Sequence, residues 1–113
     1  MTDRELLELA AKAAGMTRHR YCEAWGSMNE YTPQHGFFGA SWNPLRDDGD
    51  ALRLAIDASV QFGVTLEDSR GYAESGDIYI EFEWDMHRPS DRYAAVRRAI
   101  VQVVAKSIAT KEA

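Results

Sequence analysis

The chain of 113 residues has one cysteine, three prolines and no long hydrophobic run. A lone cysteine, Cys22, excludes an internal disulfide framework and any zinc site built from several cysteines. No stretch reaches the roughly 20 apolar residues that a membrane-spanning helix needs, and no apolar segment follows a basic start as in a signal peptide. We therefore expect a cytoplasmic protein without a membrane association.

No segment rich in glycine, serine or proline divides the chain, and no repeat of fixed period occurs. The hydrophobic residues make up 45% of the chain, which is close to the globular average and excludes a disordered protein. The sequence therefore predicts a single domain over residues 1–113.

The net charge of −5 is unevenly distributed. Residues 65–85 contain one basic and seven acidic side chains, a local charge of −6, whereas residues 86–113 have a local charge of +4. An acidic total argues against duplex nucleic acid as the main partner, because that affinity comes from Lys and Arg side chains that neutralise phosphates. The acidic segment instead favours a protein partner with a basic surface.

Three helices are predicted from capping residues and apolar spacing. Thr2 and Glu5 form a capping-box pattern at the start of a helix over residues 3–14. Aspartates precede a second helix over residues 49–61, and the third follows Pro89 and Ser90. Its expected inner side chains share helical spacing; they are Tyr93, Val96, Ile100, Val103, Val104 and Ser107.

Strands are predicted near residues 19–25, 36–41, 64–67 and 77–85, with a loop rich in Gly, Ser and Asp from residue 68 to Gly76. The resulting order is α-β-β-α-β-β-α. Because consecutive short strands join in antiparallel pairs, we expect an α+β fold with three helices on a small antiparallel sheet.

The segment 77–85 alternates strictly between apolar and polar residues, which is typical of a half-buried strand. The predicted outward residues share one face, and they are Asp77, Tyr79, Glu81, Glu83 and Asp85. They follow one another at steps of roughly 6.5–7 Å, close to the spacing of about 7 Å between phosphates along one nucleic-acid strand. One interpretation is a solvated face whose charges prevent pairing with other chains. The other is a docking surface for a basic partner, with Tyr79 as an aromatic anchor.

The run from Trp42 to Ala55 reads Trp-Asn-Pro-Leu-x-Asp-Asp-Gly-Asp-Ala-Leu-Arg-Leu-Ala. This run, the opening residues 1–15 and residues 95–101 resemble, in the same order, blocks of small uncharacterised proteins encoded by tailed bacteriophages and prophages. Together the blocks cover about a third of the chain. Members of that family usually continue with a Lys-containing stretch, whereas residues 56–59 of this chain read Ile-Asp-Ala-Ser. The family has no established activity, so the resemblance implies a phage setting in the cytoplasm of a bacterial host and no catalytic residues.

No local motif indicates a metal, cofactor or catalytic site. Asp47, Asp48 and Asp50 fit helix capping better than metal binding, because an EF-hand loop starting at Asp47 would need a Glu where Ala58 stands. The chain also lacks a phosphate-binding glycine loop and a Gly-x-Ser-x-Gly elbow. The three histidines are dispersed, and Cys22 is interpreted as a small buried side chain.

We therefore expect a phage accessory protein that binds another protein through its acidic face, for instance as a nucleic-acid mimic that inhibits a host defence complex. A second hypothesis is a small enzyme with a cleft in the aromatic region 19–42, lined by Tyr21, Trp25, Tyr31, His35 and Trp42. Within that region Trp25, Tyr31 and Trp42 are also the second candidate for partner binding. A third hypothesis is a nucleic-acid binder that uses the basic side chains of the last helix, namely Arg92, Arg97, Arg98 and Lys106.

Overall fold

The computed structural model describes residues 1–112, which form three helices and six strands separated by short turns. The helices are α1 (Asp3–Ala13), α2 (Asp48–Asp57) and α3 (Asp91–Glu112). The strands are β1 (His19–Cys22), β2 (Ser27–Thr32), β3 (Gly36–Trp42), β4 (Gln61–Thr65), β5 (Arg70–Ser75) and β6 (Ile78–Glu83). A single 3-10 turn, η1 (Leu66–Asp68), lies between β4 and β5.

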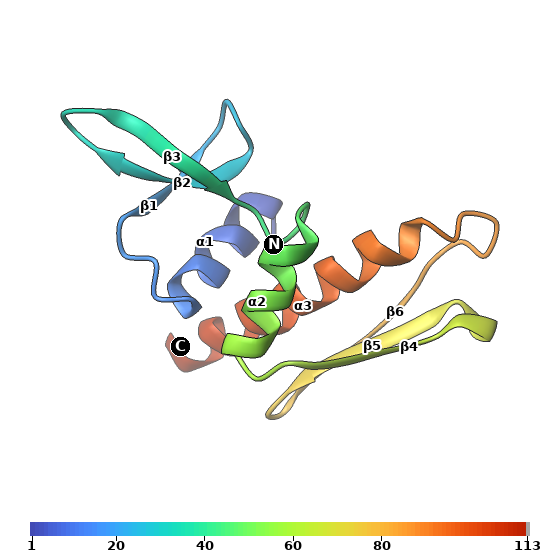
Figure 1. Cartoon of the computed structure of the whole chain (residues 1–113). Coiled ribbons are helices and arrows are strands. Elements are labelled where there is room, and N and C mark those ends of the chain that lie inside the picture. Colours follow the sequence, from blue (N-terminus) through green and yellow to red (C-terminus); the bar gives the residue numbers. More distant parts are fainter. Residues whose placement is uncertain (113) are drawn as a thin grey trace.

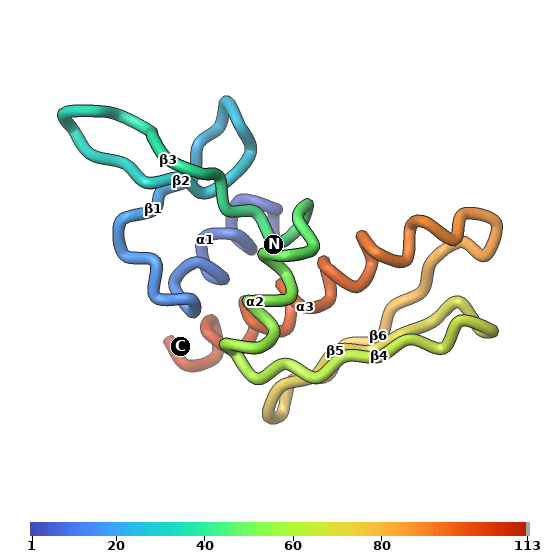
Figure 2. Tube along the Cα trace, viewed as in Figure 1, coloured from blue at the N-terminus to red at the C-terminus, as the bar shows by residue number. Residues whose placement is uncertain are grey.

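The strands form two separate antiparallel sheets, in the orders β1-β2-β3 and β4-β5-β6. The first sheet packs on α1 and the second on α3, while α1 and α2 both pack against α3. The two sheets therefore lie on opposite sides of the helices (Figure 1), and the molecule is elongated, with extents of 52 × 32 × 22 Å. Figure 2 shows the chain leaving the first sheet through α2 to reach the second.

The α+β class is confirmed, but the predicted order α-β-β-α-β-β-α and the single sheet are wrong, because each half of the chain contains a third strand. Strand β2 lies where the sequence contains Asn29 and no regular alternation of apolar residues. Asn29 is nevertheless fully buried, because it accepts a hydrogen bond from Ser27 Oγ at 2.7 Å and donates one to Ser41 Oγ at 3.1 Å. These bonds, one within β2 and one to β3, remove the cost that makes a buried amide a poor strand signal.

Strand β5 was predicted to be a loop because its inner positions are small. Its core-facing residues Gly71 and Ala73 pair with Phe82 and Ile80 of β6. The Phe82 ring occupies the space where a Cβ of residue 71 would stand. The apolar surface of this part of the sheet therefore comes from β6, and β5 contributes backbone pairing without large apolar side chains.

The helix starts follow the predictions, whereas the helix ends differ. Glu5 N donates to Thr2 Oγ1 at 3.2 Å, which confirms the capping box, and Asp47 caps α2 by accepting from Asp50 N at 2.8 Å. Helix α2 ends at Asp57 instead of residue 61, because Ser59 has a φ of 56° and turns the chain into β4.

Helix α3 is buried on more than one side, since α1 and the second sheet both pack against it. Its fully buried residues therefore follow no single stripe; they are Ala99, Ile100, Val101, Val103, Val104 and Ala105. The predicted inner residues Ile100, Val103 and Val104 are confirmed. Tyr93 is 52% exposed, so its assignment to the inner stripe was wrong: the first turns of α3 extend beyond the packed part of the helix.

The segment that joins the two halves is anchored by Trp42 and Asn43. Trp42 lies in the core cluster and is only 8% exposed. Asn43 N donates to Asp50 Oδ2 at 2.9 Å, and Asn43 Nδ2 donates to the carbonyl of Gly26 at 2.9 Å. These two bonds tie the first sheet to the start of α2.

Candidate functional site

The outer face of the second sheet contains the acidic residues that the sequence singled out. Tyr79, Glu81 and Glu83 lie on β6 and are exposed, while Ile78, Ile80 and Phe82 pack against the core. Asp77 precedes the strand and Asp85 follows it, and both are exposed. The alternation predicted for this segment is confirmed.

Strand β5 adds a second row of side chains to this face. Arg70, Tyr72 and Glu74 are the register partners of Glu83, Glu81 and Tyr79, so they point to the same side of the sheet. Arg70 Nε lies 3.6 Å from Glu83 Oε1, and both side chains are largely exposed, so this ion pair contributes little to stability. The sequence analysis missed all three residues: the alternation of large polar with small side chains over 70–75 indicates that they share one side, but it does not indicate the strand with which they pair.

Two tyrosines occupy the middle of the face. The rings of Tyr72 and Tyr79 stack with centroids 5.9 Å apart and an interplanar angle of 15°. Gly63 of β4 provides the space beside them, because a Cβ at that position would lie 2.8 Å from Tyr72 Cε1. The tyrosine pair is therefore a flat aromatic surface with carboxylates on either side. We call the surface formed by Tyr72, Tyr79, Glu74, Glu81 and Glu83 the acidic sheet face.

The acidic surroundings affect the ionisation of Tyr79. Desolvation of the hydroxyl raises the pKa of Tyr79, and Glu81 raises it further through its negative charge and through a hydrogen bond of 3.3 Å. Tyr79 donates that hydrogen bond, so ionisation of the phenol would remove it and add a charge beside the carboxylate. At neutral pH Tyr79 is a neutral hydrogen-bond donor within an anionic surface.

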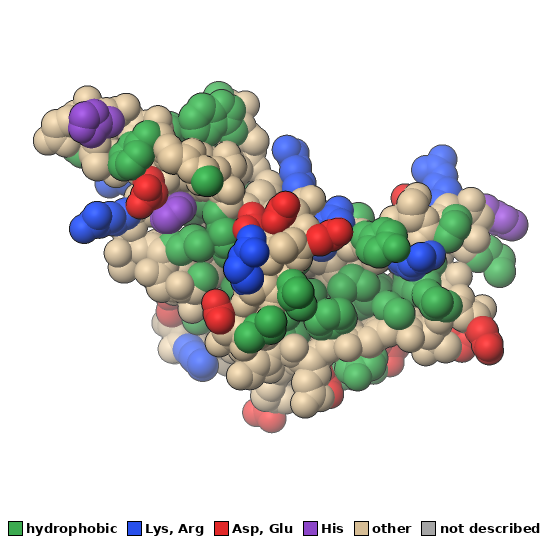
Figure 3. Space-filling view, viewed as in Figure 1, with side chains coloured by type: hydrophobic (Ala, Val, Ile, Leu, Met, Phe, Trp, Pro, Cys, Tyr) green, Lys and Arg blue, Asp and Glu red, His purple; other side chains and the backbone are tan. Residues whose placement is uncertain are grey.

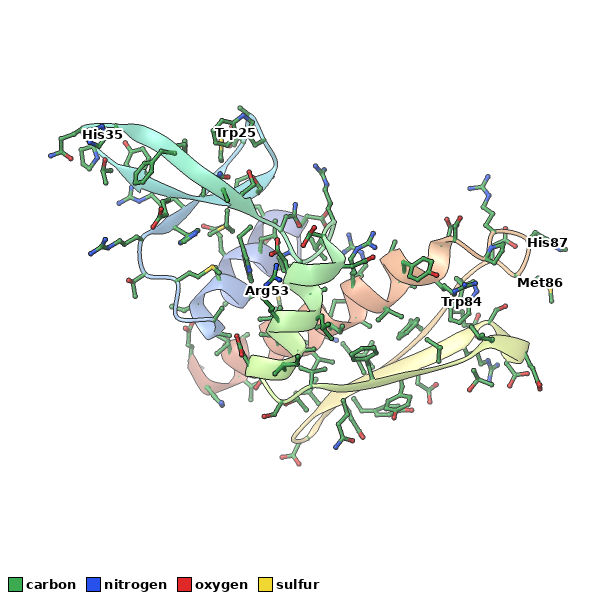
Figure 4. The ribbon with its side chains drawn as sticks, in the orientation of Figure 1. Trp25, His35, Arg53, Trp84, Met86 and His87 are labelled. Carbon is green, nitrogen blue, oxygen red and sulfur yellow. The ribbon has the colours of Figure 1, made fainter. Side chains whose placement is uncertain are left out.

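The aromatic residues of region 19–42 do not meet in one cleft. Trp25 lies in the loop between β1 and β2, and His35 lies at the turn between β2 and β3, at the far end of the hairpin (Figure 4). Trp42 is only 8% exposed and belongs to the core. Tyr31 packs edge-on against Phe37 with centroids 5.1 Å apart. The structure therefore separates Trp25, Tyr31 and Trp42.

A cavity of about 880 Å³ does lie between α1 and the first sheet, where Tyr21 and Tyr31 contribute to its lining. Arg4 lies 5.3 Å from the ring centre of Tyr21, and Arg20 lies 4.9 Å from that of Tyr31. His19 also lines it, and His19 Nδ1 is buried without a hydrogen-bond partner among the described residues. Strand alternation separates His19 from Cys22 on β1, so these two side chains do not form a nucleophile and base pair.

The aspartates at the start of α2 are occupied by structural contacts. Asp47 caps the helix, Asp48 Oδ1 lies 2.7 Å from Arg97 Nη1, and Asp50 accepts from Asn43 N and from Arg53 Nη2. Within residues 1–112 no group of three or more His, Cys, Asp or Glu side chains is arranged to hold a metal ion.

The basic side chains of α3 are also largely engaged within the protein. Arg97, one of the four basic side chains of the nucleic-acid-binding hypothesis, is mostly buried: its Nε donates to the carbonyl of Leu45 at 3.0 Å, and its Nη1 binds Asp48. Arg98 binds Asp3 at 2.8 Å, and Arg92 lies over the ring of Tyr93. Lys106 is exposed. The helix therefore presents no continuous basic row to solvent.

Comparison with protein-family models, curated proteins and solved structures gives no match to this chain. Among residues 1–112, no helix combines the length and the apolar character required to cross a bilayer.

Proposed function

We propose that the protein acts by binding another protein, and that the acidic sheet face docks on a basic surface of that partner. The single observation that carries this proposal is the stack of the exposed Tyr79 on the half-buried Tyr72, beside the carboxylates of Glu74, Glu81 and Glu83. Tyrosines are among the residues that contribute most to binding energy in protein interfaces, and charged rims steer association.

The charge pattern supports the same proposal. The segment 65–85 has a local charge of −6, and three of its seven carboxylates, those of Glu74, Glu81 and Glu83, lie on one side of two adjacent strands together with Arg70. Exposed charges of one sign raise the rate at which an oppositely charged surface is encountered, and that effect falls as salt screens them. A basic partner would therefore be recognised first by charge and then held by the tyrosines.

A narrower form of the proposal is a nucleic-acid mimic that inhibits a host defence complex in a phage-infected bacterium. The steps of roughly 6.5–7 Å between outward residues of β6 support it, as does the resemblance of residues 1–15, 42–55 and 95–101 to phage-encoded proteins. In this form the basic partner surface is a nucleic-acid-binding groove of a host protein.

The test is affinity capture from a bacterial lysate, followed by a comparison of two charge variants. The double variant E81K/E83K reverses two charges on the acidic sheet face, while E8K/E23K makes the same change of net charge at an exposed position of α1 and at an exposed position just after β1. We expect E81K/E83K to lose the captured protein and E8K/E23K to retain it, because only the first pair adjoins the tyrosines. Capture by the wild type should weaken as the salt concentration rises.

Replacing Tyr72 and Tyr79 by Ala gives a second readout, because loss of an aromatic anchor increases dissociation with little effect on salt dependence. A partner that binds E81K/E83K with unchanged affinity and unchanged salt dependence would contradict the proposal.

A further inference from the structure

The cavity between α1 and the first sheet has the size and the lining of a small-molecule site. Its volume of about 880 Å³ lies within the range of roughly 300–1,000 Å³ that ligand pockets occupy. Apolar and aromatic side chains contribute to its lining, namely Leu9, Met16, Met28, Tyr31 and Phe37. Charged and polar side chains of α1 and β1 line it as well. Such a lining suits a molecule that combines a flat apolar body with a polar group.

The charged part of the lining is mainly basic, in a protein whose net charge is −5. Three basic side chains, Arg4, Lys12 and Arg20, line the cavity together with one carboxylate. Carboxylates bind the first two at 2.7–3.3 Å. Arg20 has no ion-pair partner within residues 1–112, and its guanidinium lies 4.9 Å from the ring centre of Tyr31. A cation–π contact positions the guanidinium without an acceptor for its N–H groups, so Arg20 can donate to an anion.

His19 supplies a second unpaired group. Its Nδ1 atom is buried and has no hydrogen-bond partner among the described residues, and the side chain lines the same cavity. A buried polar atom without a partner is unfavourable in the folded protein, because it has given up its hydrogen bond to water. A ligand that pairs with His19 removes that cost.

The free edge of β1 brings these groups together. Strand β1 lies at the end of the order β1-β2-β3, and Tyr31 N donates to the carbonyl of Arg18 at 3.1 Å. Because the backbone groups of successive residues point to alternate sides of a strand, the N–H of His19 points away from β2. His19 and Arg20 lie on opposite faces of β1, yet both line the cavity, so it is accessible from both faces at this edge. Backbone N–H groups at a sheet edge form concave sites for anions.

We infer that this cavity binds a small aromatic anion, whose carboxylate or phosphate oxygens accept hydrogen bonds from Arg20 and His19. The planar guanidinium of arginine matches the oxygens of both groups. Aromatic and methionine side chains of the lining favour a flat ring as the apolar body of the ligand. The inference does not depend on the function proposed for the acidic sheet face, which belongs to the other sheet and has the opposite charge.

The test uses anilinonaphthalene sulfonate, a fluorescent aromatic anion, titrated against the purified full chain. We expect saturable binding by the wild type. R20Q should weaken it by at least about tenfold, because the charge-assisted hydrogen bonds to the sulfonate are lost. R88Q is the matched control: it removes the same charge from an exposed position in the loop before α3, outside the cavity, and should leave the affinity unchanged.

H19F distinguishes a ligand-binding role of His19 from a structural role. The variant removes the unpaired nitrogen and keeps a ring of similar size, so it should not lower the midpoint of thermal unfolding. It should weaken binding of the dye by about threefold or more, because the ligand loses a hydrogen bond. A purely structural histidine would give the opposite result, a lower midpoint and an unchanged affinity.

Three competitors with one aromatic ring each identify the group that is recognised. Phenyl phosphate and phenylacetate should displace the dye, and the tighter of the two shows whether the site prefers a phosphate or a carboxylate. Benzyl alcohol has the ring without the charge and should displace the dye at least about tenfold less well.

A second hollow controls for binding of the dye through its rings alone. It is lined by apolar side chains of α2, α3 and β4, among them Leu52, Phe62 and Val64. Figure 3 shows hydrophobic side chains gathered between α2 and the second sheet. V64K places a charge in this hollow and should leave the binding that depends on Arg20 unchanged.

Three outcomes would overturn the inference. The first is binding of the dye that R20Q leaves unchanged, whether or not V64K abolishes it. The second is displacement by benzyl alcohol as effective as displacement by the two anions. The third is an H19F variant with a lower midpoint and the affinity of the wild type. All measurements use the purified chain, so their failure leaves the proposed protein partner untouched.

Discussion

Phe82 and Gly71 face each other across β5 and β6, and the Phe82 ring fills the space that a side chain at position 71 would need. Phe82 packs in turn against the core cluster beneath α3. A Cβ at residue 71 would lie 2.3 Å from Phe82 Cζ and 2.7 Å from the carbonyl oxygen of Gly63, so a side chain there must displace the ring or the backbone of β4.

We predict that G71A lowers stability by about 1–3 kcal/mol, the usual cost of adding a carbon to a packed site. The matched control is G49A in α2, where a Cβ would meet mainly the flexible end of Arg53. Combining G71A with F82L should recover part of the loss, because the smaller side chain leaves room for the methyl group. Thermal unfolding of the four proteins measures these effects, and a G71A variant as stable as the wild type would refute the close packing.

The same contact explains why β5 lacks the alternating apolar residues from which β6 was predicted. Strand β6 has its apolar residues at alternate positions, and this period of two can be recognised from the sequence of β6 alone. Strand β5 has Gly71 and Ala73 on its core side, so its apolar face is supplied by a neighbour. The sequence pattern of one strand does not reveal the side chains that the neighbouring strand of the sheet contributes.

The residues of the candidate site on β6 were predictable from the sequence, whereas those on β5 were not. Tyr79, Glu81 and Glu83 follow from the alternation of β6 alone. Tyr72 and Glu74 required the register between β5 and β6, which depends on pairing that no local signal fixes. The burial of Arg97 was likewise unpredictable, because its hydrogen-bond acceptor, the Leu45 carbonyl, lies 52 residues away.

Asn29 leads to a second prediction, because it is a fully buried amide that links two serines on the first sheet. We expect N29A to lower stability by about 1–3 kcal/mol, since it leaves the buried hydroxyl of Ser27 without its acceptor. S41A should cost less, because Ser41 is exposed and water can replace it. Urea unfolding gives both values. Equal losses for the two variants would contradict the central role of Asn29.

Tyr79 gives a prediction in the alkaline range. Its raised pKa means that the unfolded chain loses the phenolic proton first, near the ordinary value of about 10. The folded state then holds more protons than the unfolded state, so stability falls as pH rises from there through the raised pKa of the folded state. We expect Y79F to show a smaller fall over the same interval.

E81Q should move the pKa of Tyr79 back toward its ordinary value, because it removes the negative charge beside the phenol. The change is measured by NMR titration of the labelled tyrosine ring, with E8Q as a control that alters a carboxylate beside α1. If E81Q and E8Q gave the same titration curve as the wild type, the charge of Glu81 would have no part in the shift.

Helix α3 has a consequence for the order in which the chain can fold. It is separated from α1 by both sheets and α2 along the chain, yet Leu6 and Leu7 of α1 belong to the same core cluster as Ile100 and Val104 of α3. Contacts between segments about 90 residues apart form slowly, because a long loop must close before they contribute. A chain that has been synthesised only as far as β6 therefore keeps exposed to water the side of α1 that packs against α3.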